Sequence, residues 1–227
     1  MKYNNIRYAK FIERQNRFVA YAKVEGKVET VHVKNTGRCK ELLLPDSDVI
    51  LVKTDNPARK TQYDLVAVYK EGLGWVNIDS QAPNQVMKEW LMSLPELFKN
   101  VTLLKPEYTY GKSRVDFYLE CGNRKILIEV KGCTLEINGI GYFPDAPTER
   151  GVKHLHELAE AARKGYECYI AFVIAMPDVR EVLPNVNTHP EFGVALDAAR
   201  KQGVKVLYAP CNVLPDELSI RDVVVSC

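Results

Sequence analysis

The chain has 227 residues and a mass of 25.8 kDa, which is enough to bury a hydrophobic core as one large domain or two small ones. Hydrophobic residues make up 46% and charged residues 26% of the chain, which are ordinary values for a globular protein. The formal net charge of +2 excludes a globally basic nucleic-acid binder, so any basic surface must be local.

The six cysteines are scattered along the chain, with no CxxC pair and no metal-ligand spacing. Several lie in apolar runs typical of strands, as Cys168 does, so we expect reduced, structural thiols. The first residues contain no apolar signal segment, and no segment approaches about 18 consecutive apolar residues. The sequence therefore predicts a cytoplasmic protein without a membrane partner.

Residues 1–80 predict a small β-domain. Apolar or alternating runs, separated by turn-like residues, occur near 6–13, 17–24, 28–33, 48–53, 63–70 and 74–78. A short helix is expected over residues 37–43, ended by Pro45. Three strands, a helix and two or three more strands is the order of an OB-fold barrel, which often binds nucleic acids or oligosaccharides. A small barrel of another type is the alternative.

The segment that leads into this predicted helix carries the candidate nucleic-acid-binding residues Lys34, Asn35, Thr36, Gly37 and Arg38. Asn35 or Thr36 is expected to cap the helix, and the exposed backbone N–H groups at such an end favour a phosphate. Lys34, Arg38 and Lys40 would add positive charge. A plain helix cap beside solvated basic side chains is the alternative.

From residue 81 the pattern changes to alternating helices and strands. Helices are expected at 81–91, at about 149–164 after a cap by Asp145 or Thr148, and at 190–202. Strands are expected near 101–109, 113–117, 127–132, 167–175, 204–208 and 218–225, and the nearly all-apolar run at 167–175 predicts a strand covered on both faces. This order is that of the restriction-endonuclease-like, or PD-(D/E)xK, fold. The sequence thus predicts an α/β protein with an OB-fold-like domain at 1–80 and a nuclease-like domain at 81–227.

Two neighbouring strands, joined by a turn at 121–125, carry the residues with the clearest chemistry. Side chains alternate between the faces of a strand, so Glu129 and Lys131 share a face that Asp116 can join from the partner strand. Two acids and an amine are costly to bury without partners. Asp116, Glu129 and the backbone carbonyl of Val130 offer oxygen ligands, so we expect Mg²⁺ or Mn²⁺ here. Solvated charges on two surface strands are the alternative.

The helix after residue 148 supplies further candidates. Arg150, His154 and Glu157 share one face at spacings of four and three residues. Arg150 would grip a phosphate with Lys153 nearby, and His154 would assist proton transfer or orientation; an exposed charged face is the alternative. Weaker candidates for a third group beside the metal are Glu89, Glu107 and Asn84. No nucleophile elbow, P-loop or dinucleotide-binding motif occurs.

Several of these motifs together resemble the sugar fermentation stimulation protein A family. They are NTG at 35–37, SRVDF at 113–117, IEVKG at 128–132 with Thr134 and Leu135, and FPDAPTERG at 143–151 followed by Lys153, His154 and Leu155. The PDAPTERG block is far more specific than the D…ExK pattern. The resemblance covers essentially the whole chain and implies an OB-like domain followed by a PD-(D/E)xK-like domain, with Asp116, Glu129 and Lys131 as a nuclease-type triad. Arg150, His154 and Asn35 match family positions whose role is unsettled.

The same resemblance implies a DNA-binding protein linked to the regulation of sugar metabolism, notably that of maltose. The intact triad, however, is what a cleaving enzyme needs. Two hypotheses therefore stay open, a Mg²⁺- or Mn²⁺-dependent nuclease acting on DNA or RNA, and a non-cleaving DNA-binding regulator that keeps the nuclease fold. A sugar- or nucleotide-sensing barrel is a third hypothesis, and the sequence also leaves a homodimer open.

Overall fold

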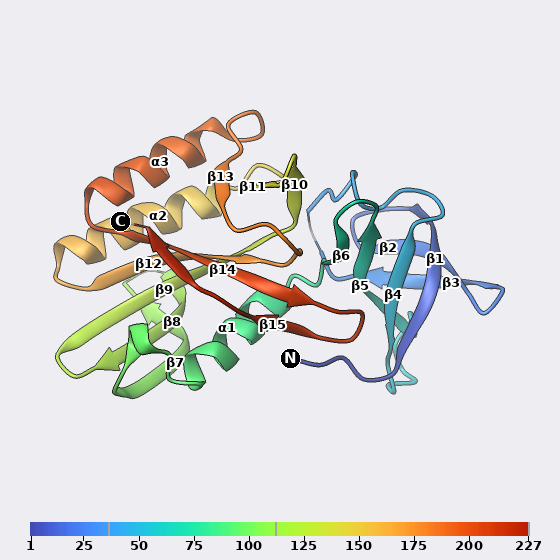
Figure 1. Ribbon diagram of the computed structural model, residues 1–227, viewed down its shortest axis with the longest axis horizontal. Helices are drawn as coiled ribbons and strands as arrows, with labels where there is room; N and C mark the ends of the chain where they lie inside the picture. Colours follow the sequence, from blue (N-terminus) through green and yellow to red (C-terminus); the bar gives the residue numbers. More distant parts are fainter. Residues whose placement is uncertain (36, 112, 227) are drawn as a thin grey trace.

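The computed structural model describes residues 1–35, 37–111 and 113–226 (Figure 1). The first sheet consists of β1 (Ile6–Arg14), β2 (Val19–Val24), β3 (Lys27–Val33), β4 (Asp48–Lys53), β5 (Tyr63–Lys70) and β6 (Gly74–Asn77). Its order is β3-β2-β1-β4-β5-β6, and a parallel pairing of β3 with β5 closes β1 to β5 into a barrel. The predicted OB-like barrel is confirmed.

The predicted helix over residues 37–43 is wrong, since the structure shows only a turn at residues 40–42. The backbone carbonyls that would begin the helical hydrogen bonds are already used: the Arg14 guanidinium donates to the carbonyl oxygens of Gly37 and Arg38 at 2.8 and 2.9 Å. Cys39 also has a positive φ of 45°, which an α-helix does not allow. The predicted helix cap by Asn35 is therefore wrong as well, and Thr36 lies outside the described residues.

The rest of the chain forms an α/β unit around a second sheet. Its helices are α1 (Ala82–Met92), η1 (Glu96–Phe98), α2 (Glu149–Arg163) and α3 (Pro190–Lys201). Its main strands are β7 (Val101–Tyr110), β8 (Ser113–Cys121), β9 (Arg124–Cys133), β12 (Glu167–Ile174), β14 (Lys205–Val213), β15 (Leu218–Ile220) and β16 (Val224–Ser226). The sheet order is β15-β14-β12-β9-β8-β7, with β16 also paired to β14.

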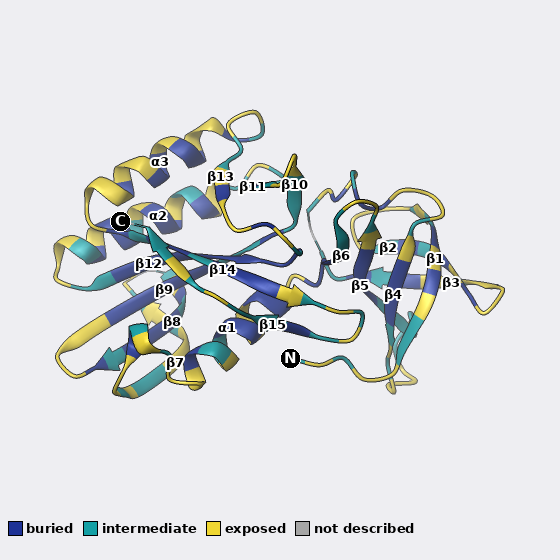
Figure 2. Ribbon diagram, viewed as in Figure 1, coloured by how far each residue is buried: buried dark blue, intermediate teal, exposed yellow. Residues whose placement is uncertain are grey.

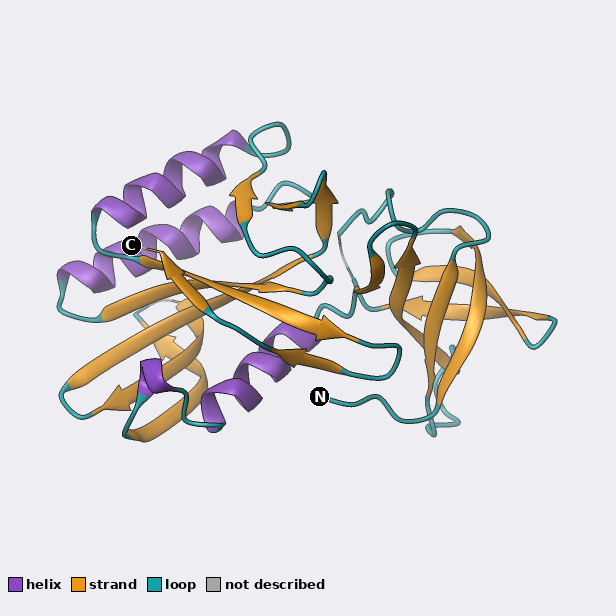
Figure 3. Ribbon diagram, in the orientation of Figure 1, coloured by secondary structure: helices purple, strands orange, loops and turns teal. Residues whose placement is uncertain are grey.

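Helices cover both faces of this sheet. Helices α2 and α3 lie together on one face, and α1 lies on the other face near β15 (Figures 1 and 3). Strand β12 pairs in parallel with both β9 and β14, and seven of its eight residues are buried, as expected for a strand with helices on both sides (Figure 2). The chain thus places the β8–β9 hairpin between α1 and α2.

A third, three-stranded sheet was not predicted. It consists of β10 (Leu135–Ile137), β11 (Ile140–Phe143) and β13 (Val182–Pro184), in the order β10-β11-β13. These strands have only three or four residues each, too short for an alternating pattern to stand out.

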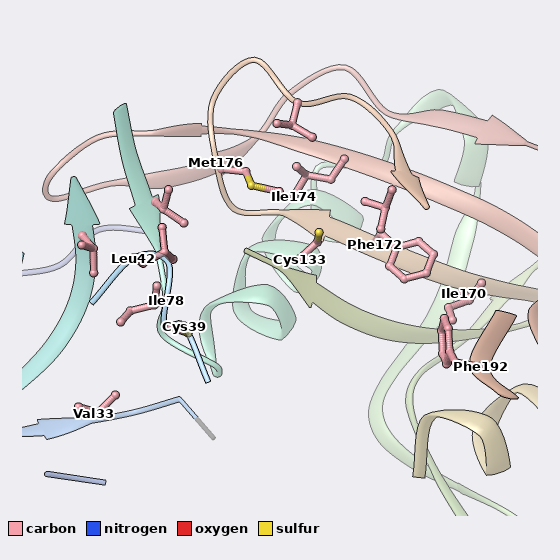
Figure 4. Close-up of a cluster of buried hydrophobic side chains, with 14 of the residues drawn as sticks. Val33, Cys39, Leu42, Ile78, Cys133, Ile170, Phe172, Ile174, Met176 and Phe192 are labelled. Atoms are coloured by element: carbon pink, nitrogen blue, oxygen red, sulfur yellow. The ribbon is translucent and has the colours of Figure 1, made fainter. Parts of the chain in front are cut away.

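One hydrophobic core runs through both parts of the molecule. Figure 4 shows Val33, Cys39, Leu42 and Ile78 from the barrel side, with Cys133, Ile174 and Met176 from the C-terminal unit, and all of these belong to one buried cluster. The predicted boundary at residue 80 falls in the short link between β6 and α1. No helix within the described part of the chain is long and apolar enough to cross a membrane.

Candidate metal centre and nucleic-acid interface

The β8–β9 hairpin brings the two predicted acids together. Phe117 of β8 pairs with Ile128 of β9 in the antiparallel hairpin. The residue before Phe117, Asp116, therefore lies beside the residues that follow Ile128 on β9. The backbone N–H of Val130 donates to Asp116 Oδ2 at 2.7 Å, and Asn84 Nδ2 donates to Asp116 Oδ1 at 2.8 Å. Asp116 is therefore held from β9 on one side and from α1 on the other.

Glu129 lies on β9, the strand that pairs with β8, and its side chain is only 3% exposed. Its Oε1 atom accepts a hydrogen bond from Lys131 Nζ at 2.6 Å and a second one from the His154 ring of helix α2. Its Oε2 atom is buried and has no hydrogen-bond partner. A buried carboxylate oxygen without a partner is costly, so this atom marks a place where a cationic ligand would be stabilised.

The hydrogen bond to His154 has a definite direction. Arg150 Nε can only donate, and it lies 3.3 Å from His154 Nε2, so that nitrogen is the acceptor. His154 Nδ1 then carries the proton and donates it to Glu129 Oε1. The ring is buried, at 6% exposure, and Arg150 in turn orients it. The alternative of a fully exposed charged face does not hold for His154, which is buried and links the exposed Arg150 to the buried Glu129.

The two acids ionise differently. Burial of Asp116 and the negative charge of Glu129 raise the pKa of the Asp116 carboxyl above its usual range. Burial also acts to raise the pKa of Glu129, but the hydrogen bonds from His154 and Lys131 outweigh it and lower that pKa. Two adjacent carboxyl groups with opposite shifts are typical of sites that bind a cation or transfer protons.

The residues present fit a hard divalent cation. Two carboxylates on adjacent strands supply oxygen ligands, and Glu129 Oε2 has no other partner. Within residues 1–35, 37–111 and 113–226, no group of three or more His, Cys, Asp or Glu side chains is arranged to hold a metal ion. Further ligands would therefore be groups other than these side-chain types, such as the backbone carbonyl predicted for Val130 or water.

Asp116 opens into a cleft of about 350 Å³ between the barrel and the C-terminal unit. The residues that line it include Tyr3, Lys34, Asp79, Asn84, Lys88 and Asp116. Lys34 Nζ forms an ion pair with the buried Asp79 carboxylate at 2.7 Å, so its charge is neutralised inside the cleft.

The cleft at Asp116 is not lined by the other predicted nucleic-acid-binding residues Asn35, Gly37, Arg38 and Lys153. Asn35 is a structural residue, because its Nδ2 donates to the carbonyl of Ile78 at 2.8 Å and its Oδ1 accepts from the N–H of Gly37 at 2.7 Å. Gly37 and Arg38 line a separate basic pocket. Lys153 is exposed, and its Nζ lies 3.7 Å from Glu157.

Two of the three weaker candidates have other partners. Glu89 forms an ion pair with the N-terminal ammonium of Met1 at 2.7 Å, and Glu107 is exposed with Arg114 3.6 Å away. Asn84 is the one that reaches Asp116. Asp145, predicted only as a helix cap, instead lies against Gly37, where an added Cβ would be 2.1 Å from Asp145 Oδ2. Thr148 caps α2, through its side chain and the N–H of Gly151.

Comparisons with known proteins decide the family. A family model described as "Sugar fermentation stimulation protein RE domain" matches residues 81–217, and one described as "SfsA N-terminal OB domain" matches residues 12–78. The chain belongs to the sugar fermentation stimulation protein family. A family homologue from Clostridium beijerinckii is 54% identical over 224 residues, covering 99% of this chain and 98% of the homologue. One from Clostridium botulinum is 48% identical over 220 residues, covering 96% and 95%.

A solved structure of the same family has the same overall fold. The structure of Pyrococcus furiosus SfsA in complex with Ca²⁺ is similar with a TM-score of 0.85 and 27% sequence identity, covering 98% of this chain and 96% of that one. The family resemblance read from the sequence motifs is therefore confirmed, as are the OB-like barrel and the C-terminal α/β unit.

Proposed function

We propose that this member of the sugar fermentation stimulation protein family is a divalent-metal-dependent nuclease of the PD-(D/E)xK type that binds DNA, with RNA as the alternative substrate. The observation that carries the proposal is the buried pair of Asp116 and Glu129 with Lys131 beside them, in which Glu129 Oε2 has no partner. Mg²⁺ or Mn²⁺ held by Asp116, Glu129 and the Val130 carbonyl would polarise the scissile phosphate and lower the pKa of an attacking water.

The surrounding residues have distinct tasks in this proposal. Asn84 and the Val130 N–H fix both oxygens of Asp116 in the cleft. His154 fixes Glu129 from helix α2, and Arg150 holds the His154 ring. Both are positioning residues in this proposal, because both ring nitrogens of His154 are engaged, Nδ1 with Glu129 and Nε2 with Arg150. Lys131, on the same strand face, is the cation available to orient the water or to stabilise negative charge on the phosphate.

Two similarities support this assignment. The description of the matching family model names an RE domain, which agrees with a restriction-endonuclease-like fold for residues 81–217. The related Pyrococcus furiosus protein was solved in complex with Ca²⁺, a hard cation with the same preference for oxygen ligands as Mg²⁺.

A non-cleaving DNA-binding regulator of sugar metabolism is the second candidate. Two observations favour it. Lys131 and His154 both donate to Glu129 Oε1, so this oxygen already has partners without a metal ion. The described ranges also hold no third metal-binding side chain at the site. DNA binding by such a protein should persist in EDTA and weaken steeply with salt.

The test is cleavage of end-labelled single-stranded DNA, double-stranded DNA and RNA in Mg²⁺ or Mn²⁺ by wild type and Asp116→Asn. Asn keeps the size of Asp116, and Asn84 can rotate its amide to pair with it, so the fold is preserved. Asp197→Asn, at an exposed position of α3, is the matched control. Metal-dependent cutting by wild type and Asp197→Asn, lost in Asp116→Asn, is expected. Equal cutting by all three, or binding without cutting by all three, would contradict the nuclease proposal.

A further inference from the structure

A second cavity, of about 660 Å³, shares no lining residue with the cleft at Asp116 and is not part of the proposed active site. Its walls come from the end of β1 and the β1–β2 loop, the 37–43 segment and the end of the link to α2. We call it the basic pocket and define it by the charged residues Arg14, Arg17, Arg38 and Lys40, with Asn16, Gly37, Leu43, Ala146 and Pro147 completing the lining. Both parts of the molecule contribute to it.

Arg14 builds the frame of this pocket. Its guanidinium donates hydrogen bonds to five backbone carbonyl oxygens, those of Asn16, Arg17, Asn35, Gly37 and Arg38, at distances of 2.6 to 3.2 Å. These bonds tie the β1–β2 loop to Asn35, Gly37 and Arg38. The Asn16 side chain adds a second constraint, because its Oδ1 accepts from the N–H groups of Phe18 and Val19. The backbone that presents the other cations is therefore fixed in advance.

Three cations remain for a ligand. Arg17, Arg38 and Lys40 are exposed, and none of them forms an ion pair with another residue in the described ranges. None of the described residues that line the pocket is acidic or aromatic. Asp145 lies beside Gly37 without lining the pocket, and it accepts hydrogen bonds from the N–H groups of Arg38 and Cys39. A rigid pocket with uncompensated positive charge and no ring for stacking suits phosphate groups and not nucleobases.

The position of the pocket connects it to the candidate active site. The segment that carries Gly37 and Arg38 also carries Asn35, which lines a small polar cavity of about 130 Å³ together with Asn84, Val130 and Asp145. That cavity shares Asn84 with the cleft at Asp116. The β1–β2 loop is also the loop through which OB-folds commonly contact oligonucleotides.

We propose that the basic pocket binds backbone phosphates of the same nucleic-acid strand whose scissile phosphate lies at Asp116, so that the strand is held at two places. The inference rests on the proposed function only in taking a nucleic acid as the ligand, and it does not require that the protein cleaves it. Arg17, Arg38 and Lys40 are the phosphate contacts, and Arg14 is the positioning residue that shapes the pocket. These contacts carry affinity without sequence preference.

The test measures binding without cutting. Full-length protein with Asp116→Asn is titrated, in EDTA and over a range of salt concentrations, against a fluorescent single-stranded oligonucleotide. The triple variant Arg17→Ala, Arg38→Ala, Lys40→Ala is compared with Lys27→Ala, Lys125→Ala, Lys201→Ala, which removes the same charge from exposed positions elsewhere. Three lost phosphate contacts should reduce the slope of log affinity against log salt by about 2 in the first variant, while the control keeps the parent slope.

A charge-preserving variant excludes a folding defect. Arg17→Lys with Arg38→Lys should bind with nearly the parent slope, and both triple variants should melt at the parent temperature because the substituted side chains are exposed. Adenosine monophosphate is titrated as a second probe. Three results would overturn the inference. They are equal salt slopes in the two triple variants, no saturable oligonucleotide binding by the parent protein, and a loss of affinity for adenosine monophosphate alone.

The outcome separates this inference from the proposed function. Pocket-dependent binding without any metal-dependent cutting by wild type would overturn the nuclease and leave the basic pocket in place. Cutting that depends on Asp116, with equal salt slopes in the two triple variants, would overturn the pocket alone.

Discussion

Asp116 and Glu129 are adjacent carboxylates, but removing their charges should change the stability of the protein in opposite directions. Since the pKa of Asp116 is raised, its ionised form costs folding free energy at neutral pH, and Asp116→Asn should raise the melting temperature in the absence of divalent ions. Glu129→Gln should lower the free energy of unfolding by about 3 kcal/mol, because it leaves the partly buried Lys131 and the buried His154 facing an uncharged amide.

Thermal unfolding of the two variants in EDTA checks this pair of expectations. Asp197→Asn, on the exposed face of α3, should melt as wild type does. If Asp116→Asn lowers the melting temperature, or if Glu129→Gln leaves it unchanged, the two acids do not share the electrostatic arrangement described above.

Strand alternation predicted part of this arrangement. It placed Glu129 and Lys131 on one face, and the structure shows them 2.6 Å apart. It could not predict that His154 turns inward to Glu129, because a histidine on an amphipathic helix looks the same in sequence whether it faces solvent or a buried acid. Asn84 was only a weak candidate since its contact with Asp116 spans 32 positions and depends on how α1 docks.

At the scale of elements, Gly132 sets the distance between α1 and β9. A Cβ added at Gly132 would lie 2.7 Å from Pro83 Cγ, in the first turn of α1. Gly132→Ala should push this end of α1 away, cost about 1–3 kcal/mol of unfolding free energy, and weaken the hold of the neighbouring Asn84 on Asp116.

Melting and Mn²⁺ titration of Gly132→Ala test this close contact. Gly122→Ala is the comparison. A Cβ added at Gly122 would have no atom within 4 Å, but its φ of +59° disfavours any other residue. This variant should therefore lose stability and keep the metal affinity of wild type. Unchanged stability and metal affinity in Gly132→Ala would mean that α1 is not positioned by this contact.

An ionic cluster links three strands of the C-terminal sheet. Glu167 on β12 accepts from Arg124 on β9 at 2.7 Å and from Lys205 on β14 at 2.8 Å. Burial acts to raise the pKa of Glu167, but these hydrogen bonds outweigh it and hold the pKa at about 2. A lowered pKa gives stability that is present above the unfolded-state value near 4.3 and is lost as the pH falls towards 2.

Glu167→Gln should therefore lower the free energy of unfolding by about 1–2 kcal/mol at pH 7. The difference from wild type should shrink between about pH 4.5 and pH 2, as urea unfolding at several pH values would show. A difference that stays constant over that range would contradict the role of Glu167 as an ionised partner.

The elements themselves were predicted unevenly. The long alternating or apolar runs of β1 to β5, β9 and β12 were located from sequence because their patterns extend over six to ten residues. The segment at 37–43 was misjudged because Arg14, more than twenty positions earlier in the chain, takes the carbonyl oxygens that a helix would use. Such long-range competition for hydrogen bonds leaves no local sequence signal.

At the scale of the whole molecule, polar contacts fix the barrel against the C-terminal unit beside their shared core. Lys70 Nζ, at the end of β5, donates to the backbone carbonyl of Glu136 at 3.0 Å and pairs with its carboxylate at 2.5 Å. The N–H of Asn77 donates to the carbonyl of Ala175 at 2.9 Å. The cleft at Asp116 and the basic pocket both have walls from the two parts, so their shape depends on this docking.

Lys70→Met should loosen the docking and cost about 1–2 kcal/mol, because the mostly buried Glu136 carboxylate loses its cation. Hydrogen exchange should become faster at β10 and at the β5–β6 turn, with the middle of β12 unaffected. Lys10→Met, which removes an exposed ion pair with Asp48, should change neither stability nor exchange appreciably. Identical exchange in all three proteins would show that the Lys70–Glu136 contact does not hold the two parts together.

The central claim is that Asp116 and Glu129 together hold one divalent cation. Calorimetric titration of Mn²⁺ into wild type, Asp116→Asn and Asp197→Asn tests it most directly. We expect saturable one-site binding by wild type and by the Asp197 control, and its loss in Asp116→Asn although that variant is at least as stable. Equal Mn²⁺ binding by all three proteins, or binding by none, would contradict it.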